Sequence, residues 1–474
     1  MTTERNHPES APWILKGFWR AAWTAVRGTQ EDYTSGSLTR AMILLAIPMM
    51  LELLMESTFT LVDTYFVGKL GAAAVAITGL SGALIVVVFA IAIGLSMGAT
   101  AMVSRRIGEG DPEGAGLAAG QSVLAGVLIS IPVSLCGALL APSLLALMGG
   151  SPAVIAGWAY PAVLFGGSVT IFLLFLNNAI FRGAGDAVIA MRALALANLL
   201  NCILDPCLIF GWGPFPKWGL MGAAVATTIG RGTGVAYQFV MLFRGELRLR
   251  VRRAHFAVNA PVMKRLLRIS LTGIIQYSVA TASWIGVARI VALFGSVALA
   301  GYTIATRLIL ASILVSWGLS QAAATLVGQC LGARKPDRAE RAVWLAGFYN
   351  IAFLSSVSIV FWVLAKLLIG FFTTDRAVAL IGSEALRFFS LGQVFAAYGM
   401  VFTSAFNGAG DTDTPTYINF ICYWVFELPV AYALAHIAGW GPTGVYVAVA
   451  GSSVIWAGIG FLWFRRGAWK TRTV

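Results

Sequence analysis

Long apolar runs separated by short polar segments follow one another along almost the whole chain. Mostly apolar runs of 20 or more residues recur twelve times, at 41–66, 72–103, 117–148, 153–181, 188–212, 218–243, 262–294, 296–328, 340–370, 377–407, 414–438 and 442–464. A transmembrane helix needs about 20 such residues to cross a hydrocarbon core of roughly 30 Å. Only helices and closed barrels satisfy backbone hydrogen bonds in lipid, and runs of this length form helices. The pattern therefore predicts an all-α polytopic membrane protein with twelve transmembrane helices.

The two halves of the chain repeat each other. An offset of 224 residues superposes Gly108 on Gly332, and the motif FRGAGD at 181–186 recurs as FNGAGD at 406–411 with an offset of 225. Repeated hydrophobic halves, with a binding site between or within them, are a common transporter architecture. We therefore expect two six-helix repeats, the N lobe and the C lobe. The glycines of the repeated motif indicate tight turns that need positive φ, and we expect no catalytic role for them.

Composition and charge indicate the class of protein and its orientation in the membrane. Hydrophobic residues make up 58% of the 474 residues, charged residues 11%, and the mean hydropathy is +0.82. On the side that holds both termini we count 25 of the 33 Lys and Arg, against five on the other side. This bias predicts a multi-pass protein of the cell (inner) membrane with cytoplasmic termini. Nucleic acid is excluded as a partner because no soluble domain remains to present a groove.

The same pattern divides the chain into segments. These are a cytoplasmic N-terminal tail (1–36), the N lobe (37–243), a cytoplasmic linker (244–261), the C lobe (262–466) and a cytoplasmic C-terminal tail (467–474).

The N-terminal tail contains an amphipathic stretch from Pro12 to Arg27. On a helical wheel its apolar face consists of Leu15, Phe18, Trp19, Ala22 and Val26, and its basic face of Lys16, Arg20 and Arg27. This pattern favours a helix lying in the membrane interface. The alternative is a disordered basic tail.

Motifs for enzyme chemistry are missing from the sequence. The five cysteines are scattered through apolar runs, far from the three histidines, without the spacing of a metal site or a disulfide framework. No GxxxxGK[ST] loop is found, so ATP hydrolysis by this chain is not expected. We therefore expect a protein that is not an enzyme and holds no cofactor.

Carboxylates within the apolar runs are the strongest candidates for function. The first run contains Glu52, Glu56 and Asp63, which fall within about 40° of one another on a helix. The fifth run presents a matching polar face of Asn198, Asn201 and Asp205. A charge in lipid is costly unless it faces a wet cavity or finds a partner. The two faces are expected to meet inside the N lobe, either as a functional site or as protonated groups that bond helices together.

Three segments carry a resemblance to a known family. The segment LVDTYFVGKLG at 61–71, the paired GAGD loops and LLNCILDPCLIFG at 199–211 resemble those of multidrug and toxic compound extrusion (MATE) transporters. The likeness runs from about Ser37 to Arg466. That family lies within the multidrug/oligosaccharidyl-lipid/polysaccharide exporter superfamily, which also contains flippases of lipid-linked sugars. The resemblance implies a monomeric transporter of two six-helix lobes.

The resemblance also implies roles for individual residues. Asp63 matches the aspartate that the family uses for cation coupling, and the oxygen-bearing residues around it match Asn178, Asn201, Asp205 and Thr227. With Glu56 they form a candidate coupling site, which could carry a proton or ligate Na⁺. Apart from such a Na⁺, no metal is expected.

The C lobe departs from part of the family pattern. Glu52, Glu56 and Asp63 align with Gln276, Ala280 and Val287, and the main intramembrane acid of this half is Glu427. Coupling is therefore expected in the N lobe, which modestly favours a proton. Glu52, Gln276 and Glu427 are candidates for the substrate cavity.

These observations predict a secondary active transporter that exchanges H⁺ or Na⁺ for amphipathic, mostly cationic small molecules by alternating access. Its expected partners are those organic substrates, the coupling ion and membrane lipids. The alternative is a flippase of a lipid-linked or anionic substrate, which would need inward-facing basic residues such as Arg231, Arg289 and Arg307. A membrane-embedded enzyme is disfavoured because no nucleophile or metal constellation is found.

Overall fold

The computed structural model describes residues 11–29, 31–244 and 248–474, and within these ranges all the regular elements are helices, without a strand. The first half contains α1 (Ala11–Arg27), α2 (Leu38–Gly68), α3 (Ala72–Gly108), α4 (Pro112–Leu139), α5 (Ala141–Leu147), α6 (Pro152–Ile155), α7 (Ala159–Gly166), α8 (Ser168–Ala184), α9 (Ala187–Phe210), α10 (Leu220–Arg244) and η1 (Arg253–Phe256). The second half contains α11 (Ala260–Ala292), α12 (Ser296–Gly332), α13 (Pro336–Phe372), α14 (Arg376–Gly408), α15 (Asp413–Asn419), η2 (Phe420–Glu427), α16 (Leu428–Tyr432), η3 (Ala433–Ile437), α17 (Pro442–Arg465) and η4 (Ala468–Thr471).

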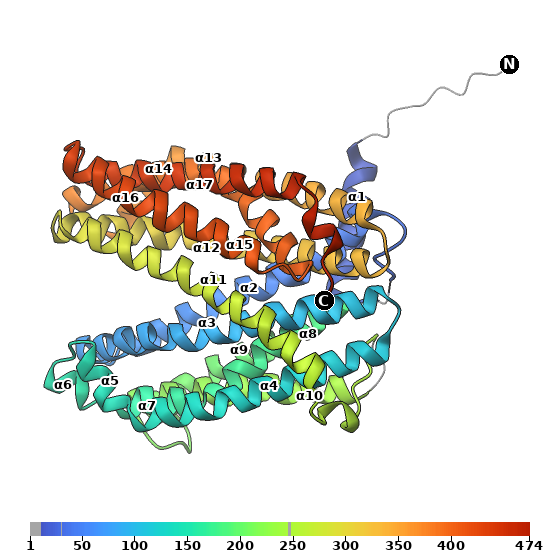
Figure 1. Ribbon diagram of the computed structural model, residues 1–474. Coiled ribbons are helices and arrows are strands. Elements are labelled where there is room, and N and C mark those ends of the chain that lie inside the picture. Colours follow the sequence, from blue (N-terminus) through green and yellow to red (C-terminus); the bar gives the residue numbers. More distant parts are fainter. Residues whose placement is uncertain (1–10, 30, 245–247) are drawn as a thin grey trace.

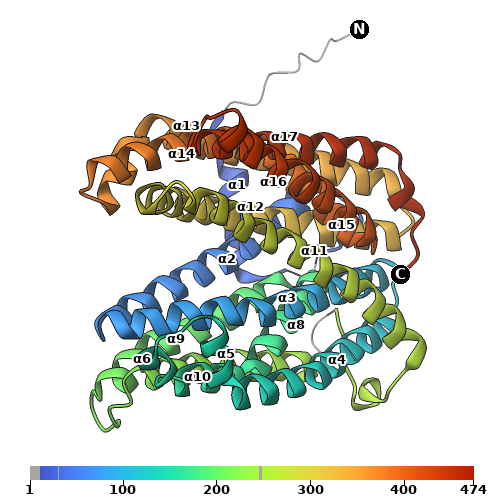
Figure 2. The same cartoon turned by 60° about the vertical axis from the view of Figure 1, so that its left-hand side comes forward.

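The helices form two bundles (Figure 1). Helices α2–α10 build the N lobe and α11–α17 build the C lobe. The lobes lie together at the end that carries α1, η1 and the C-terminus, called the terminal end below, and splay apart toward the opposite end, as Figure 2 also shows. Among the described helices, ten are long and apolar enough to span a membrane, and α7 with α8 forms an eleventh, bent by 41°. The 25-residue α10 completes the predicted twelve.

Three predicted spans differ in detail from the observed helices. The run at 117–148 is divided, because α4 ends at Leu139 and the short α5 follows. The run at 153–181 breaks between α7 and α8, where two consecutive glycines, Gly166 and Gly167, weaken the helix. The run at 414–438 contains two π-helical stretches, η2 and η3. Apolar length predicts that a run spans the membrane, whereas these breaks depend on local backbone hydrogen bonding.

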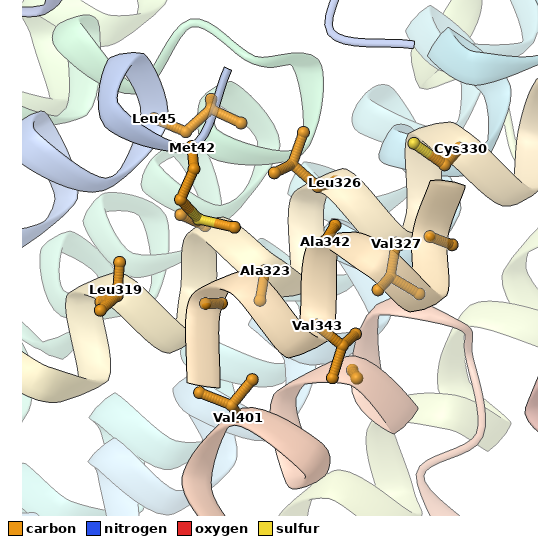
Figure 3. Close-up of a cluster of buried hydrophobic side chains, with 14 of the residues drawn as sticks. Met42, Leu45, Leu319, Ala323, Leu326, Val327, Cys330, Ala342, Val343 and Val401 are labelled. Carbon is orange, nitrogen blue, oxygen red and sulfur yellow. The ribbon is translucent and has the colours of Figure 1, made fainter. Parts of the chain in front are cut away.

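Helix α2 connects the two lobes. Its first half packs into a buried cluster with α12, α13 and α14 of the C lobe, with Met42 and Leu45 against Leu319, Ala323 and their neighbours (Figure 3). Its second half lies along α9 of the N lobe, where Asn198 Nδ2 donates to Met55 O over 2.8 Å. The helix that carries the carboxylate stripe therefore begins on one lobe and ends on the other.

Helix α11 makes the equivalent crossing in the opposite direction. Its first half packs so closely on α3 of the N lobe that a Cβ on Gly94 would lie 2.4 Å from Ile274. Further along, Trp424 Nε1 in η2 donates to Val279 O over 3.0 Å, within the C lobe. The first helix of each repeat thus exchanges lobes, as expected if the sequence repeat is also a repeat in space.

The N-terminal tail binds both lobes at the terminal end. Helix α1 is present as predicted and packs Ala21 and Ala25 against the protein, while Trp19 and Trp23 are exposed by 68% and 62%. The side chains of Leu15, Lys16 and Phe18 lie outside the described part of the chain. The exposed tryptophans suit the membrane interface, which stays a prediction.

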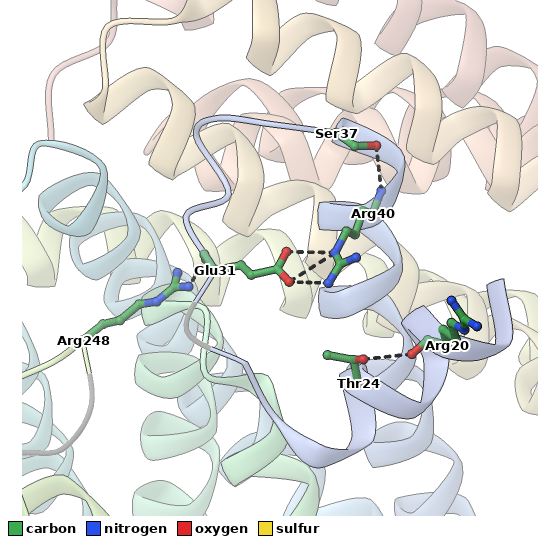
Figure 4. Close-up of polar contacts among 6 residues, drawn as sticks. All are labelled: Arg20, Thr24, Glu31, Ser37, Arg40 and Arg248. Atoms are coloured by element: carbon green, nitrogen blue, oxygen red, sulfur yellow. Dashed lines mark hydrogen bonds and ion pairs between the residues drawn. The ribbon is translucent and has the colours of Figure 1, made fainter. Parts of the chain in front are cut away.

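Residues 31–36 after this helix form a strap. On the N lobe side, Arg248 donates to Glu31 O, and the Glu31 carboxylate pairs with Arg40 at the start of α2 (Figure 4). On the C lobe side, Arg338 of α13 donates to Tyr33 O, Ser35 O and Gly36 O at 2.7–3.1 Å. The strap therefore ties the lobes together.

Candidate cation site and transport cavity

The predicted polar faces of α2 and α9 do meet. Asn201 Nδ2 donates to Asp205 Oδ1 over 3.1 Å, and both side chains are completely buried. Asp63 is partly buried and lies close enough to Asp205 for the two carboxyl groups to interact electrostatically. Thr227 on α10 is also buried.

Several oxygens of this cluster lack partners. Asp63 Oδ1, Asn201 Oδ1 and Asp205 Oδ2 are buried atoms for which the described residues supply no hydrogen bond. Buried polar atoms are nearly always satisfied, so each such atom calls for an explanation. A proton on a carboxyl group, or a small cation among the three oxygens, would supply one.

Glu52 and Asn178 form a separate group, with Glu52 about three helical turns before Asp63 on α2 and so closer to the terminal end. Asn178 Nδ2 donates to Glu52 Oε1 over 2.9 Å, and Arg182 Nη1 lies 3.1 Å from the same oxygen. Asn178 in turn accepts a hydrogen bond from Gln238. The structure therefore brings Asn178 to Glu52, and among the described residues Asn178 makes no hydrogen bond to Asp63 or Asp205.

Arg231 of α10 is the residue whose place in this site the sequence did not reveal. Its guanidinium lies 3.6 Å from Glu56 Oε1 and sits over the rings of Phe59 and Phe89, at 5.3 and 5.7 Å from their centroids. It also attracts the Asp63 carboxylate. The available signal was a lone arginine within an apolar run, which needs a counter-ion. The N-lobe site is thus a mixed cluster in which arginines offset part of the acidic charge.

Among residues 11–29, 31–244 and 248–474, no group of three or more His, Cys, Asp or Glu side chains is placed to hold a metal ion. Any Na⁺ in the N lobe would therefore depend on amide, hydroxyl or backbone oxygens in addition to the carboxylates.

A cavity of about 240 Å³ lies between the lobes. On one side it is lined by α3, and on the other by the C lobe, including Gln276, Trp284, Trp317, Tyr423 and Trp456. No lysine, arginine or histidine is among its lining residues. Its lining combines five aromatic side chains with eight uncharged amide or hydroxyl side chains, and the remaining lining residues are small or aliphatic.

A second cavity of about 120 Å³ extends from it into the C lobe. The two share Trp284, Tyr423 and Trp456, and the second is lined by Glu427. Glu427 is the last residue of the π-helical η2 and accepts a hydrogen bond from Ser452. π-Helical turns often mark functional sites.

The three predicted cavity residues thus lie in three different places. Gln276 lines the cavity between the lobes and Glu427 the one inside the C lobe, whereas Glu52 lines neither of them. Arg289 and Arg307 are exposed and also line neither cavity.

Comparison with known proteins matches this architecture. The chain is 28% identical over 443 residues to "Probable multidrug resistance protein NorM" of Thermotoga maritima, covering 92% of this chain and 94% of that one. It is 26% identical over 421 residues to "FAD transporter" of Shewanella oneidensis, covering 85% and 90%.

Solved structures resemble it over nearly the whole chain. One described as an outward-facing conformation of a multidrug resistance MATE family transporter superposes with a TM-score of 0.87 and 25% identity, covering 93% of this chain and 98% of that one. A transporter from Pyrococcus furiosus, whose title reports reverse polarity of its binding pocket, gives 0.86 at 25% identity over 95% and 98%. The MatE family model matches residues 48–207 and 269–433, so both lobes are included. This chain belongs to the MatE family of multidrug efflux transporters.

Proposed function

We propose that this protein is a secondary active antiporter that exports amphipathic, mostly cationic small molecules by alternating access. The observation that carries the proposal is the pair of connected cavities lined by Trp284, Tyr423, Trp456 and Glu427, with no basic side chain among the lining residues of either. Aromatic faces attract organic cations, and a carboxylate strengthens that attraction in a site shielded from water. The protein acts as a transporter and not as an enzyme, without a cofactor.

The coupling ion binds in the N lobe. Asp63 and Asp205 are the ion-carrying groups in this proposal, with Asn201, Thr227 and Glu56 around them. Asn178, which the predicted coupling site also included, belongs to the neighbouring group and bonds to Glu52. The ion is a proton rather than Na⁺ for two reasons. A guanidinium close to Glu56 and Asp63 repels a second cation, and a Na⁺ site would need more oxygen ligands than the clustered carboxylates offer. A proton needs only one carboxyl oxygen, and several are unpartnered.

The terminal end lies on the cytoplasmic side of the inner membrane. The basic loops and both tails lie on that side, in keeping with the distribution of Lys and Arg. With the lobes joined at this end, the conformation corresponds to an outward-open state of a monomeric exporter. A proton entering from outside would then reach Asp63 and Asp205 while the cytoplasmic side is sealed.

An anionic cargo is the second candidate. A relative at 26% identity is named as a transporter of FAD, and a structural neighbour is described as having reversed pocket polarity. In this chain the buried Arg231 and Arg182 are both engaged by glutamates, and Arg289 and Arg307 lie away from the cavities. These contacts favour the cationic cargo.

Everted membrane vesicles provide the test. A fluorescent cationic dye is followed while a pH gradient or a Na⁺ gradient is imposed separately. We expect dye accumulation driven by the pH gradient and no acceleration by the Na⁺ gradient alone. Dye movement under neither gradient would remove the antiporter proposal, and uptake of an anionic dye instead would favour the flippase.

A further inference from the structure

A third cavity lies at the terminal end, away from the transport cavities. Its volume is about 300 Å³. It is bounded by the start of α11, the loop that follows the second GAGD motif and the C-terminal tail, and its polar lining includes Arg265, Arg268, Thr272, Thr412 and Arg472. Neither the cation site nor the cargo cavities include any of these residues.

The charge of this cavity is positive and only partly compensated. Arg472 pairs with Asp411 at 3.2 Å, and its backbone oxygen accepts a hydrogen bond from Arg105 of the N lobe. For Arg265 and Arg268, both exposed, the described residues provide no ion pair. Asp413 is the one acidic side chain in the lining. Two guanidinium groups are therefore available to an anion.

Hydroxyl groups lie beside these arginines. Thr272 and Thr412 hydrogen-bond to each other, and Thr412 Oγ1 also donates to Ile269 O over 3.1 Å. These bonds hold the loop after the second GAGD motif against α11. Because these bonds use both hydroxyl protons, the guanidinium groups are the donors available to an anion, and arginine can bind phosphate oxygens through two parallel hydrogen bonds.

An apolar surface begins directly next to the basic one. On α11, Leu267, Leu271 and Ile275 follow one another at intervals of four residues and are 39%, 58% and 45% exposed. Arg265 and Arg268 occupy the adjacent face of the same helix, about 90° away. Tyr417 of α15 and Phe420 of η2, the elements packed beside α11, are exposed as well. A ligand bound here would meet charge at one end and hydrocarbon along the rest.

We propose that this cavity binds the phosphate headgroup of an anionic phospholipid, with the acyl chains lying over Leu267, Leu271 and Ile275. A free phosphate would use the arginines but not the apolar surface, whereas a lipid uses both. Basic residues close to the cytoplasmic leaflet attract anionic lipids, and here a cavity concentrates that attraction at one place. The assignment to the cytoplasmic leaflet rests on the proposed orientation.

Such a lipid would act at a junction between the lobes. The first half of α11 packs on α3 of the N lobe, while the GAGD loop and the tail belong to the C lobe. A headgroup held by Arg265, Arg268 and Arg472 therefore joins elements that separate if the terminal end opens. Bound anionic lipid is expected to favour the closed terminal end.

The test measures lipid binding to the purified full-length protein by native mass spectrometry, with dioleoylphosphatidylglycerol and dioleoylphosphatidylcholine as probes. We expect selective retention of phosphatidylglycerol. The double variant Arg265→Gln/Arg268→Gln should weaken it roughly 30-fold, since each basic residue contributes about a fivefold factor. Arg341→Gln removes an exposed charge of another helix, α13, outside the cavity lining, and should change binding by less than about twofold.

Several outcomes would overturn the proposal. These are equal retention of both lipids by the native chain, equal losses in the double variant and in Arg341→Gln, or complete displacement of the lipid by millimolar inorganic phosphate. Arg472→Gln, in the exposed tail, serves if the double variant does not fold, and should also reduce retention. Because the readout is binding and not export, failure of the antiporter proposal would leave this result interpretable.

Discussion

Gly108 and Gly332, equivalent positions of the two repeats, each lie against the other's helix. A Cβ on Gly108 would be 2.0 Å from Gln329 O, and a Cβ on Gly332 would be 2.2 Å from Arg105 O. Arg105 and Gln329 are themselves equivalent under the offset of 224 residues. Helices α3 and α12 therefore cross at the terminal end around a local twofold axis that relates the lobes.

The glycines of the repeated motif obey the same symmetry. A Cβ on Gly183 would approach Thr100 O at 3.1 Å, and one on its equivalent Gly408 would approach Ala324 O at 2.2 Å. Within the motif, Gly185 and Gly410 have φ of +91° and +80°, as the prediction of tight turns requires. Equivalent glycines of the two halves therefore share both a close contact with a neighbouring backbone and the same turn geometry.

The first prediction concerns this crossing. Gly332→Ala places a methyl group where only backbone fits, so the lobes cannot close at the terminal end. We expect export to fall at least tenfold. The distance between spin labels on the ends of α3 and α12, measured by pulsed electron paramagnetic resonance, should increase. Gly82→Ala, in α3 but with open space around it, should leave both unchanged. Wild-type distances in Gly332→Ala would contradict the role of this contact.

The second prediction concerns coupling. Asp63→Asn keeps the size of the side chain and removes its titratable group, so the variant should insert normally, retain substrate binding and lose gradient-driven export. Asp205→Asn should behave in the same way, because two neighbouring carboxyl groups titrate as a pair. The measurement is proton release per substrate bound, together with dye export.

Glu427→Gln is the comparison variant for that experiment. It alters a carboxyl group in the C-lobe cavity, so it should affect affinity for cationic dyes more than proton release. Undiminished export by Asp63→Asn would place the coupling site elsewhere and leave the α2 carboxylates with a structural role.

The third prediction concerns the buried pair of Glu52 and Arg182. Their side chains are only 3% and 11% exposed, so Glu52→Gln leaves a buried guanidinium without its counter-ion. Loss of one partner of a buried ion pair costs about 3–5 kcal/mol, and thermal unfolding in detergent should show a clear drop. The double variant Glu52→Gln/Arg182→Gln should recover part of the loss. Additive effects of the two substitutions would mean that the pair is not coupled.

The fourth prediction concerns the strap. Arg338→Ala removes the donors that hold the backbone of Tyr33, Ser35 and Gly36 to the C lobe, so the terminal end should open more readily. Proteolysis of the N-terminal tail should become several-fold faster, with a smaller loss of export. Arg341→Ala, three residues further along α13, is the matched control, since Arg341 bonds within its own helix. Equal protease sensitivity of both variants would argue against the strap.

The fifth prediction concerns pH and Asp186 in the first GAGD loop. Burial raises the pKa of Asp186 to about 6, and the nearby Arg248 opposes the rise only in part. The folded protein therefore holds this proton up to a higher pH than the unfolded chain, whose carboxyl titrates near 3.8. Its contribution to stability is present below pH 4, falls as the pH rises from 4 to 6 and is absent above.

The measurement for Asp186 is the difference between native protein and Asp186→Asn in thermal unfolding from pH 4 to 8. The variant should lack the fall in stability that Asp186 causes between pH 4 and 6. Each unit of pKa shift corresponds to about 1.4 kcal/mol of unfolding free energy. Parallel curves for the two proteins would show that Asp186 titrates normally.

What the sequence determined by itself depends either on residues close together in the chain or on the similarity of its two halves. Apolar run length predicted the spans, the repeat predicted two lobes, and helical periodicity placed Glu52, Glu56 and Asp63 on one face of α2. The two lobes follow from comparing one half of the sequence with the other, which needs no knowledge of contacts. The spans and the shared face follow from local backbone geometry and from the need to satisfy backbone groups in lipid, so neighbouring residues suffice. The same reasoning brought Asn201 next to Asp205, four residues apart on α9.

Only the tertiary structure decided which groups meet across helices. Asn178 and Arg182 contact Glu52, and Arg231 lies beside Glu56. Glu427 lines a cavity apart from the N-lobe cluster. A one-dimensional pattern gives the face of a helix but neither its rotation against a neighbour nor the depth at which two long side chains touch. Those follow from packing, such as the close approach of glycines on α3 and α12, because electrostatic partners are chosen by distance in space and not by distance along the chain.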